Sequence, residues 1–160
     1  MTLTGTYLTA TAALTNAAVG GLFLGFSTFV MRGLDRAEPA AAISAMQGIN
    51  VEAERSAPFL ILFFGSAVLA LILGIRSALH LREPGSGYLV AGAALCILAV
   101  VVTVAVNVPL NNALALADPA APESARTWAD YATSWTMWNH VRTVAPLLGS
   151  ALLLTGIRSR

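Results

Sequence analysis

The sequence predicts an all-α protein, a four-transmembrane-helix bundle with a short surface helix in its first long loop. Hydrophobic residues make up 57% of the chain and charged residues only 11%, and the mean hydropathy is +0.74. Soluble domains carry about 25% charged residues, so these charges are too few to cover a water-facing surface. Four long apolar runs take up most of the chain. We therefore expect residues 1–160 to form a single integral membrane domain.

Each apolar run has recognisable limits. The first run contains no charged residue before Arg32. The second run is preceded by Ser56 and contains Pro58 near its start, and both residues suit the start of a helix. The turn-rich stretch 83–87 precedes the third run, and the fourth carries polar residues in its first turns. A bilayer core needs about 20 residues of helix. The expected spans are 7–31, 57–75, 88–108 and 136–157.

The first long connection, 32–56, contains a further helix near 39–50. Pro39 suits its first turn. Ile43, Met46, Gln47 and Asn50 follow helical spacing and share one face. We expect this helix to lie at the membrane surface.

Four spans place both long connections on one side of the membrane and both termini on the other. Arg76, Arg82 and Arg158 lie on the terminal side, which favours cytoplasmic termini by the positive-inside rule. The chain contains no lysine and is rich in alanine and arginine. We expect it in a bacterial cytoplasmic membrane, with the lipid bilayer as its surroundings and assembly into a homo-oligomer left open.

Several classes of function are disfavoured. A formal charge of +1 gives no basic field for nucleic acid. The single cysteine, Cys96, excludes an internal disulfide and a Cys-x-x-Cys motif. His80 and His140 are expected on opposite sides of the membrane and cannot share a haem or metal. We therefore expect no metal site and no cofactor.

The start of the fourth span holds the strongest group of polar and aromatic residues. One stripe at helical spacing contains Trp135, Trp138, Asn139 and Arg142. Trp128 and Tyr131 continue this stripe towards the N-terminus, and we expect these two residues in an interfacial aromatic belt. An arginine near a span centre costs about 2.5–3.5 kcal/mol on insertion, and such residues are functional candidates. Snorkelling to the interface is the alternative for Arg142. His140 lies about 100° around the helix from Asn139, away from this stripe.

The end of the third span adds amide side chains. Pro109 removes a backbone hydrogen bond to Ala105, so the helix is expected to kink or end there. Asn107 and Asn111 either satisfy the freed carbonyl or face a cavity, and spacing alone does not separate these readings. In the first span, Gly21 and Gly25 form a GxxxG pair that is typical of close helix packing.

The predicted topology brings these residues to one side of the membrane. One polar pocket can therefore be lined by Gln47, Asn50, Asn107, Asn111, Asn139 and Arg142. Amides and one guanidinium without a carboxylate in reach suit a neutral-to-anionic, partly apolar ligand. The expected partner is an apolar aromatic or lipid-like small molecule.

Four motifs, in this order, resemble those of the anthrone oxygenase-like membrane family. They are 26–31 (FSTFVM) with Gly33 and Leu34, 46–50 (MQGIN), 107–111 (NVPLN) and 135–143 (WTMWNHVRT). Fungal members are associated with oxidising anthrones to anthraquinones without a bound metal or flavin. The resemblance implies an oxygenase of the monooxygenase type that needs no cofactor.

The resemblance also implies roles for individual residues. Trp135 and Trp138 would stack on the aromatic rings, and Gln47 and Asn50 would add substrate contacts. Arg142 with Asn107, Asn111 and Asn139 would hold an enolate oxygen, and His140 is the conventional base nearest the site. Two alternatives remain beside this reading: a protein that binds or transports an apolar anion or lipid, and an accessory subunit.

Overall fold

The computed structural model describes residues 3–159, which form helices and turns with no strand among them. In chain order the helices are α1 (Leu3–Gly25), the π-helix η1 (Phe26–Val30), α2 (Met31–Leu34), α3 (Pro39–Arg55), α4 (Ala57–Ala78), α5 (Ser86–Val102), the π-helix η2 (Thr103–Asn107), α6 (Val108–Ala115) and α7 (Ser124–Arg158). The all-α prediction is confirmed.

Four continuous helical segments are long and apolar enough to cross a membrane, as expected. They are Gly5–Leu34, Ala57–Ala78, Ser86–Ala115 and Ser124–Arg158. All four extend beyond the spans expected from the sequence, and the last begins 12 residues before the expected Thr136. The extension of α7 stays helical although Arg126 and Asp130 are exposed, because its apolar side chains Trp128 and Tyr131 pack against the helix of residues 39–55.

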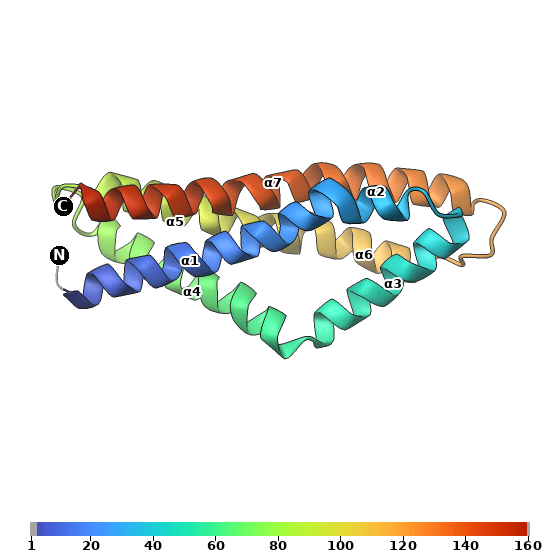
Figure 1. Cartoon of the computed structure of the whole chain (residues 1–160), viewed down its shortest axis with the longest axis horizontal. Helices are drawn as coiled ribbons and strands as arrows, with labels where there is room; N and C mark the ends of the chain where they lie inside the picture. Colours follow the sequence, from blue (N-terminus) through green and yellow to red (C-terminus); the bar gives the residue numbers. More distant parts are fainter. Residues whose placement is uncertain (1–2, 160) are drawn as a thin grey trace.

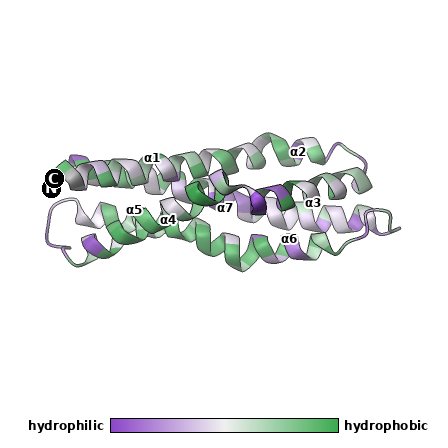
Figure 2. Cartoon of the chain, turned by 90° about the horizontal axis from the view of Figure 1, so that it is seen from below, coloured by the Kyte–Doolittle hydropathy of each residue, from purple (hydrophilic) through white to green (hydrophobic). Residues whose placement is uncertain are grey.

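The helix α7 runs the whole length of the molecule, and both termini lie at one end (Figure 1). Towards that end α7 is accompanied by α1, α4 and α5, and towards the other end by α2, α3 and α6. At 35 residues α7 is about 52 Å long, against about 30 Å for a bilayer core. Hydrophobic residues prevail around α1, α4 and α5 (Figure 2).

The helix expected in the first long connection is α3, and it is five residues longer than the predicted 39–50. Pro39 lies in its first turn as expected. Its inner face buries Ile43 and Met46 against the Trp128, Tyr131 and Trp135 side chains of α7. Trp128 and Tyr131 are therefore buried, 4% and 5% exposed, and the expected aromatic belt is wrong for both. Trp128 Nε1 instead donates to Asp35 Oδ1 at 3.1 Å.

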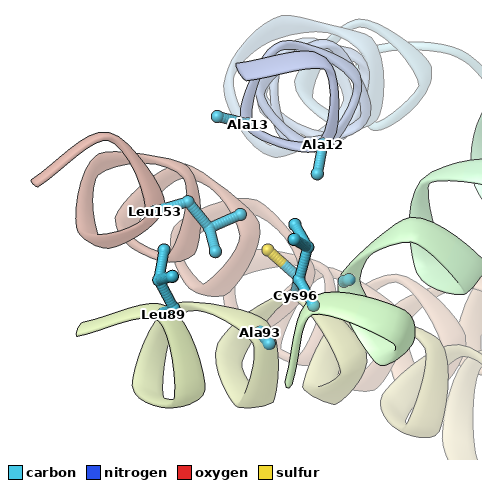
Figure 3. Packing of buried hydrophobic residues seen from close by; sticks show 8 residues of the cluster. Ala12, Ala13, Leu89, Ala93, Cys96 and Leu153 are labelled. Atoms are coloured by element: carbon cyan, nitrogen blue, oxygen red, sulfur yellow. The ribbon is translucent and has the colours of Figure 1, made fainter. Parts of the chain in front are cut away.

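The terminal half is held by close contact between α5 and α7. Figure 3 shows Leu89, Ala93 and Cys96 of α5 gathered with Leu153 of α7 and two alanines of α1. A Cβ atom placed on Gly149 would lie 2.8 Å from the Gly92 carbonyl oxygen. The two backbones therefore touch at this point.

The expected packing role of the GxxxG pair is wrong. A Cβ atom on Gly21 would meet nothing within 4 Å, and one on Gly25 would meet only the ring of Phe29 on its own helix. Gly20, one position earlier, is the glycine that faces α7. Small residues permit close packing only on the face that meets another helix.

The third membrane-spanning helix continues through Pro109 to Ala115, where a kink or an end was expected. The preceding turn is the π-helix η2, and the Val108 N–H bonds to the Thr103 carbonyl, one residue further back than in an α-helix. The wider turn accommodates the proline, whose missing N–H would otherwise interrupt the ladder.

Candidate functional site

A cavity of ≈ 490 Å³ lies between residues of α1, η1, α3, α4, η2, α6 and α7. Its volume falls within the range of small-molecule sites, about 300–1,000 Å³. The aromatic side chains of its wall are Phe23, Phe26, Phe59, Phe63, Phe64 and Trp135. The polar residues of its wall are Asn50, Glu52, Glu54, Ser56, Thr103, Asn111 and Arg142.

Arg142 is a buried cation on this wall, only 4% exposed. Its guanidinium carbon lies 4.4 Å from the ring centroid of Phe23 and 4.8 Å from that of Trp135. Aromatic faces attract a cation, with estimates of about 2 kcal/mol or more when the pair is desolvated. No carboxylate pairs with Arg142 among residues 3–159, and its Nε has no hydrogen-bond partner there. The charge is held but not neutralised.

Asn139 fixes the position of Arg142. Its Oδ1 accepts from Arg142 Nη2 at 2.8 Å, while its Nδ2 donates to the Phe23 carbonyl at 2.9 Å and to Ser27 Oγ at 2.8 Å. The Thr143 hydroxyl donates to the Asn139 carbonyl, which leaves its oxygen to accept from Ser27. These bonds use the whole Asn139 amide, so this side chain orients the guanidinium and does not face the cavity.

The two π-helices aim polar side chains at α7. Ser27 of η1 meets Asn139, and Thr103 of η2 receives a hydrogen bond of 3.4 Å from Arg142 Nη1. Asn107, the last residue of η2, donates to the Trp135 carbonyl at 3.2 Å, and its own Oδ1 has no partner. A π turn changes the register of the side chains that follow it and is frequent at functional sites.

A second hydrogen-bond group lies at the α3 side of the cavity. Asn111 Oδ1 accepts from the Tyr131 hydroxyl at 3.0 Å and from Trp135 Nε1 at 2.9 Å. Asn50 lies beside the same hydroxyl, yet its buried Nδ2 has no hydrogen-bond partner. Buried donors without partners are costly. Asn50 and Arg142 therefore offer two unpaired donor groups on the wall of one cavity.

The predicted site residues divide into three groups. Asn50, Asn111, Trp135 and Arg142 line the cavity together. Asn107 and Asn139 are fully buried behind the wall, and Gln47 caps α6 by donating to the Leu114 and Ala117 carbonyls. Trp138, 36% exposed, and His140, also exposed, lie outside the cavity lining. The structure therefore does not bring these two side chains to the cavity, and their roles stay predictions.

Other residues of the site escaped sequence reasoning. Phe23 and Thr103 look like ordinary span residues, since no pattern marks the π-helices beside them. The sequence does contain a signal that could have placed Glu52 and Glu54 at the site, because they follow Asn50 on the same helix. They line the cavity, so carboxylates do lie on the wall that was expected to lack them.

The cavity suits a flat, apolar molecule with an oxygen that carries negative charge. Apolar side chains supply most of its surface, six of the lining residues are aromatic, and Arg142 and Asn50 carry donor groups. Within residues 3–159, no three His, Cys, Asp or Glu side chains are grouped as metal ligands would be. Fold and site together define a helical protein of the membrane type with an apolar-walled cavity that contains one buried arginine.

The family model described as Anthrone oxygenase matches residues 59–152, more than half of the chain. The chain therefore belongs to the anthrone oxygenase family, as the resemblance of its motifs implied. The matched region contains Asn111, Trp135 and Arg142 of the cavity wall, whereas α3 precedes it. Comparisons with curated proteins and with solved structures gave no match.

Proposed function

We propose that this protein oxidises an anthrone-type aromatic substrate with O2 inside the membrane-level cavity, without a resident cofactor. The observation that carries the proposal is Arg142, a buried cation without a carboxylate partner on an apolar cavity wall. Family membership supports the same class of substrate.

The energetics of Arg142 favour an anionic ligand. Burying an uncompensated charge costs several kcal/mol, and the aromatic faces of Phe23 and Trp135 recover only part of that cost. An enolate oxygen beside the guanidinium would recover more. Because the interaction exists only when the substrate is deprotonated, it stabilises the reactive anion more than the neutral substrate.

An anthrone fits this requirement because removal of its methylene proton gives an aromatic enolate. The electron-rich anion can pass one electron to O2, and the resulting radical pair combines to form a carbon-bound peroxide. Loss of the second methylene hydrogen and cleavage of the O–O bond give the quinone and water. One oxygen atom of O2 stays in the product and the other leaves as water.

The substrate rings would lie against the aromatic wall, with the carbonyl oxygen at the unpaired donors. Phe26, Phe59 and Trp135 supply flat apolar surface. Arg142 and Asn50 line the cavity, and Arg142 Nε and Asn50 Nδ2 are buried donors without a partner among residues 3–159. Asn139 holds the guanidinium in place through the 2.8 Å bond.

The test is oxidation of anthrone by the detergent-purified full chain. We expect uptake of one O2 per anthraquinone formed, above the spontaneous rate, and one labelled oxygen atom in the product under ¹⁸O2. Product formation no faster than in protein-free detergent would refute the proposal. Tight binding of an anthrone enolate analogue without any O2 uptake would favour the alternative of a binding or transport protein.

A further inference from the structure

We infer that the Glu54 carboxylate accepts the proton that the substrate loses, an inference that rests on the proposed function. The reaction needs a base on the cavity wall. Glu54 and Glu52 are the lining residues, within the described chain, whose side chains can accept a proton at neutral pH. His140, the base expected from the sequence, lies outside the lining.

The position of Glu54 on α3 favours it over Glu52. Glu54 follows Asn50 by four residues, so the two side chains lie one above the other on the same helix face. Asn50 and Glu54 both line the cavity. Glu52 lies on the other flank of the stripe that Met46, Asn50 and Ala53 form.

The proposed base and the cation lie on different helices, as the substrate requires. In an anthrone the carbonyl and the methylene group occupy opposite positions of the central ring. Arg142 belongs to α7, and Glu54 belongs to the end of α3 that diverges from α7 towards the corner with α4 (Figure 1). A flat ring system between these helices would present its oxygen to one residue and its methylene to the other.

The proposed step is a single proton transfer. The C–H bond of the methylene group breaks, the proton moves to a carboxylate oxygen of Glu54, and the electron pair moves through the ring to the carbonyl oxygen beside Arg142. The proton is later returned to the peroxide that forms with O2. The carboxylate is thereby regenerated, and no other co-reactant is required.

Deuterium exchange isolates this step from the oxidation. Anthrone is incubated with the purified full chain in D2O without O2, and incorporation of deuterium at the methylene carbon is followed by mass spectrometry. We expect the wild type to accelerate exchange and Glu54→Gln to slow it about a hundredfold, the low end for a positioned base. The loss should be at least tenfold greater than that of Glu52→Gln, which removes the same charge from the same helix.

Binding distinguishes a lost base from a damaged cavity. Glu54→Gln should still bind an enolate analogue within about threefold of the wild type, because Arg142 and Asn50 are unchanged. Glu54→Gln exchanging within twofold of the wild type, or Glu52→Gln losing as much, would overturn the assignment while leaving the oxidation itself intact. A wild type that neither exchanges nor oxidises anthrone would overturn the proposed function and this inference together.

Discussion

Arg142 combines burial with an unneutralised charge, and its neighbours explain how the chain tolerates it. The guanidinium is held between two aromatic rings and bonded to Asn139 and Thr103. A purely structural arginine at this depth would be expected to find a carboxylate or several carbonyl groups. Within residues 3–159 its buried Nε instead has no hydrogen-bond partner.

Replacing Arg142 by Leu should abolish most of the oxidation. Losing one preorganised oxyanion donor typically costs about 2.7–4 kcal/mol, a hundred- to a thousandfold in rate. The fold should survive, because an uncharged residue inserts more readily at this depth. Turnover of anthrone and the thermal unfolding midpoint, measured on the same samples, check both statements.

His140→Ala is the matched control for this experiment, two positions earlier on the same helix. His140 is exposed and does not line the cavity, so its loss should change turnover by less than threefold. If His140→Ala lost turnover while Arg142→Leu kept most of it, the roles assigned to the two residues would be wrong.

Asn139→Ala should lower both stability and turnover. The change leaves the Phe23 carbonyl and the Arg142 Nη2 without their partner. Hydrogen bonds between membrane helices average about 0.6 kcal/mol each, so a loss of about 1–2 kcal/mol is expected. Thr28→Ala, which removes an exposed hydroxyl bonded only to its own helix, is the control and should leave both quantities unchanged. Unfolding midpoints and turnover of the two variants provide the comparison.

At the scale of elements, hydropathy and capping signals were sufficient to place the helices but not their ends. Ser56 starts α4 as expected, and its side chain accepts from the Phe59 N–H. The extensions of α1, α5 and α7 carry polar residues that a composition window reads as loops. Their helical state depends on tertiary cover, which a local pattern does not contain.

The π-helices and the glycine contacts could not be predicted from the sequence either, because they also depend on tertiary packing. The segment 26–30 and the segment 103–107 have no composition that separates them from an α-helix. Gly20, Gly21 and Gly25 differ only in the face on which they lie. Which face meets α7 is decided by the packing of the whole bundle.

Gly149→Ala should destabilise the bundle, whereas Gly21→Ala should not. The added methyl at Gly149 would lie 2.7 Å from Cys96 Sγ and 2.8 Å from the Gly92 carbonyl oxygen, so α5 and α7 would have to separate. Overpacking of this kind costs about 1–3 kcal/mol. Gly21 faces open space, and alanine there should be neutral or slightly stabilising. Thermal unfolding in one detergent is the measurement, and equal midpoints for the two variants would contradict it.

At the scale of the whole molecule, the candidate site was partly predictable from topology. The expected order of spans placed the ends of the first and third spans, the helix α3 and the start of α7 on one side. The cavity is lined by residues of these segments and by the first turns of α4. Within that region, spacing could not tell Asn50 and Asn111, which line the cavity, from Asn107 and Asn139, which lie behind it. The difference comes from which hydrogen bonds the neighbouring helices already satisfy.

The lone cysteine makes the membrane arrangement testable. Cys96 is 1% exposed, so the wild type should not react with a membrane-impermeant maleimide before unfolding. Ala45→Cys on the outer face of α3 and Arg82→Cys in the turn before α5 are both exposed, and they should be labelled from opposite sides of sealed vesicles. Leu71→Cys, on the apolar outer face of α4, should stay unlabelled from either side. Labelling of Ala45→Cys and Arg82→Cys from the same side would contradict four crossings.

Phe64 lines the cavity and is also 51% exposed, so at this point no more than its phenyl ring separates the cavity from the surface of the molecule. A substrate dissolved in the hydrocarbon phase therefore lies one side chain away from the site and need not pass through water. Reaction rate would then follow the mole fraction of substrate in the lipid or detergent phase. At a fixed total substrate concentration, adding empty micelles should slow turnover by surface dilution.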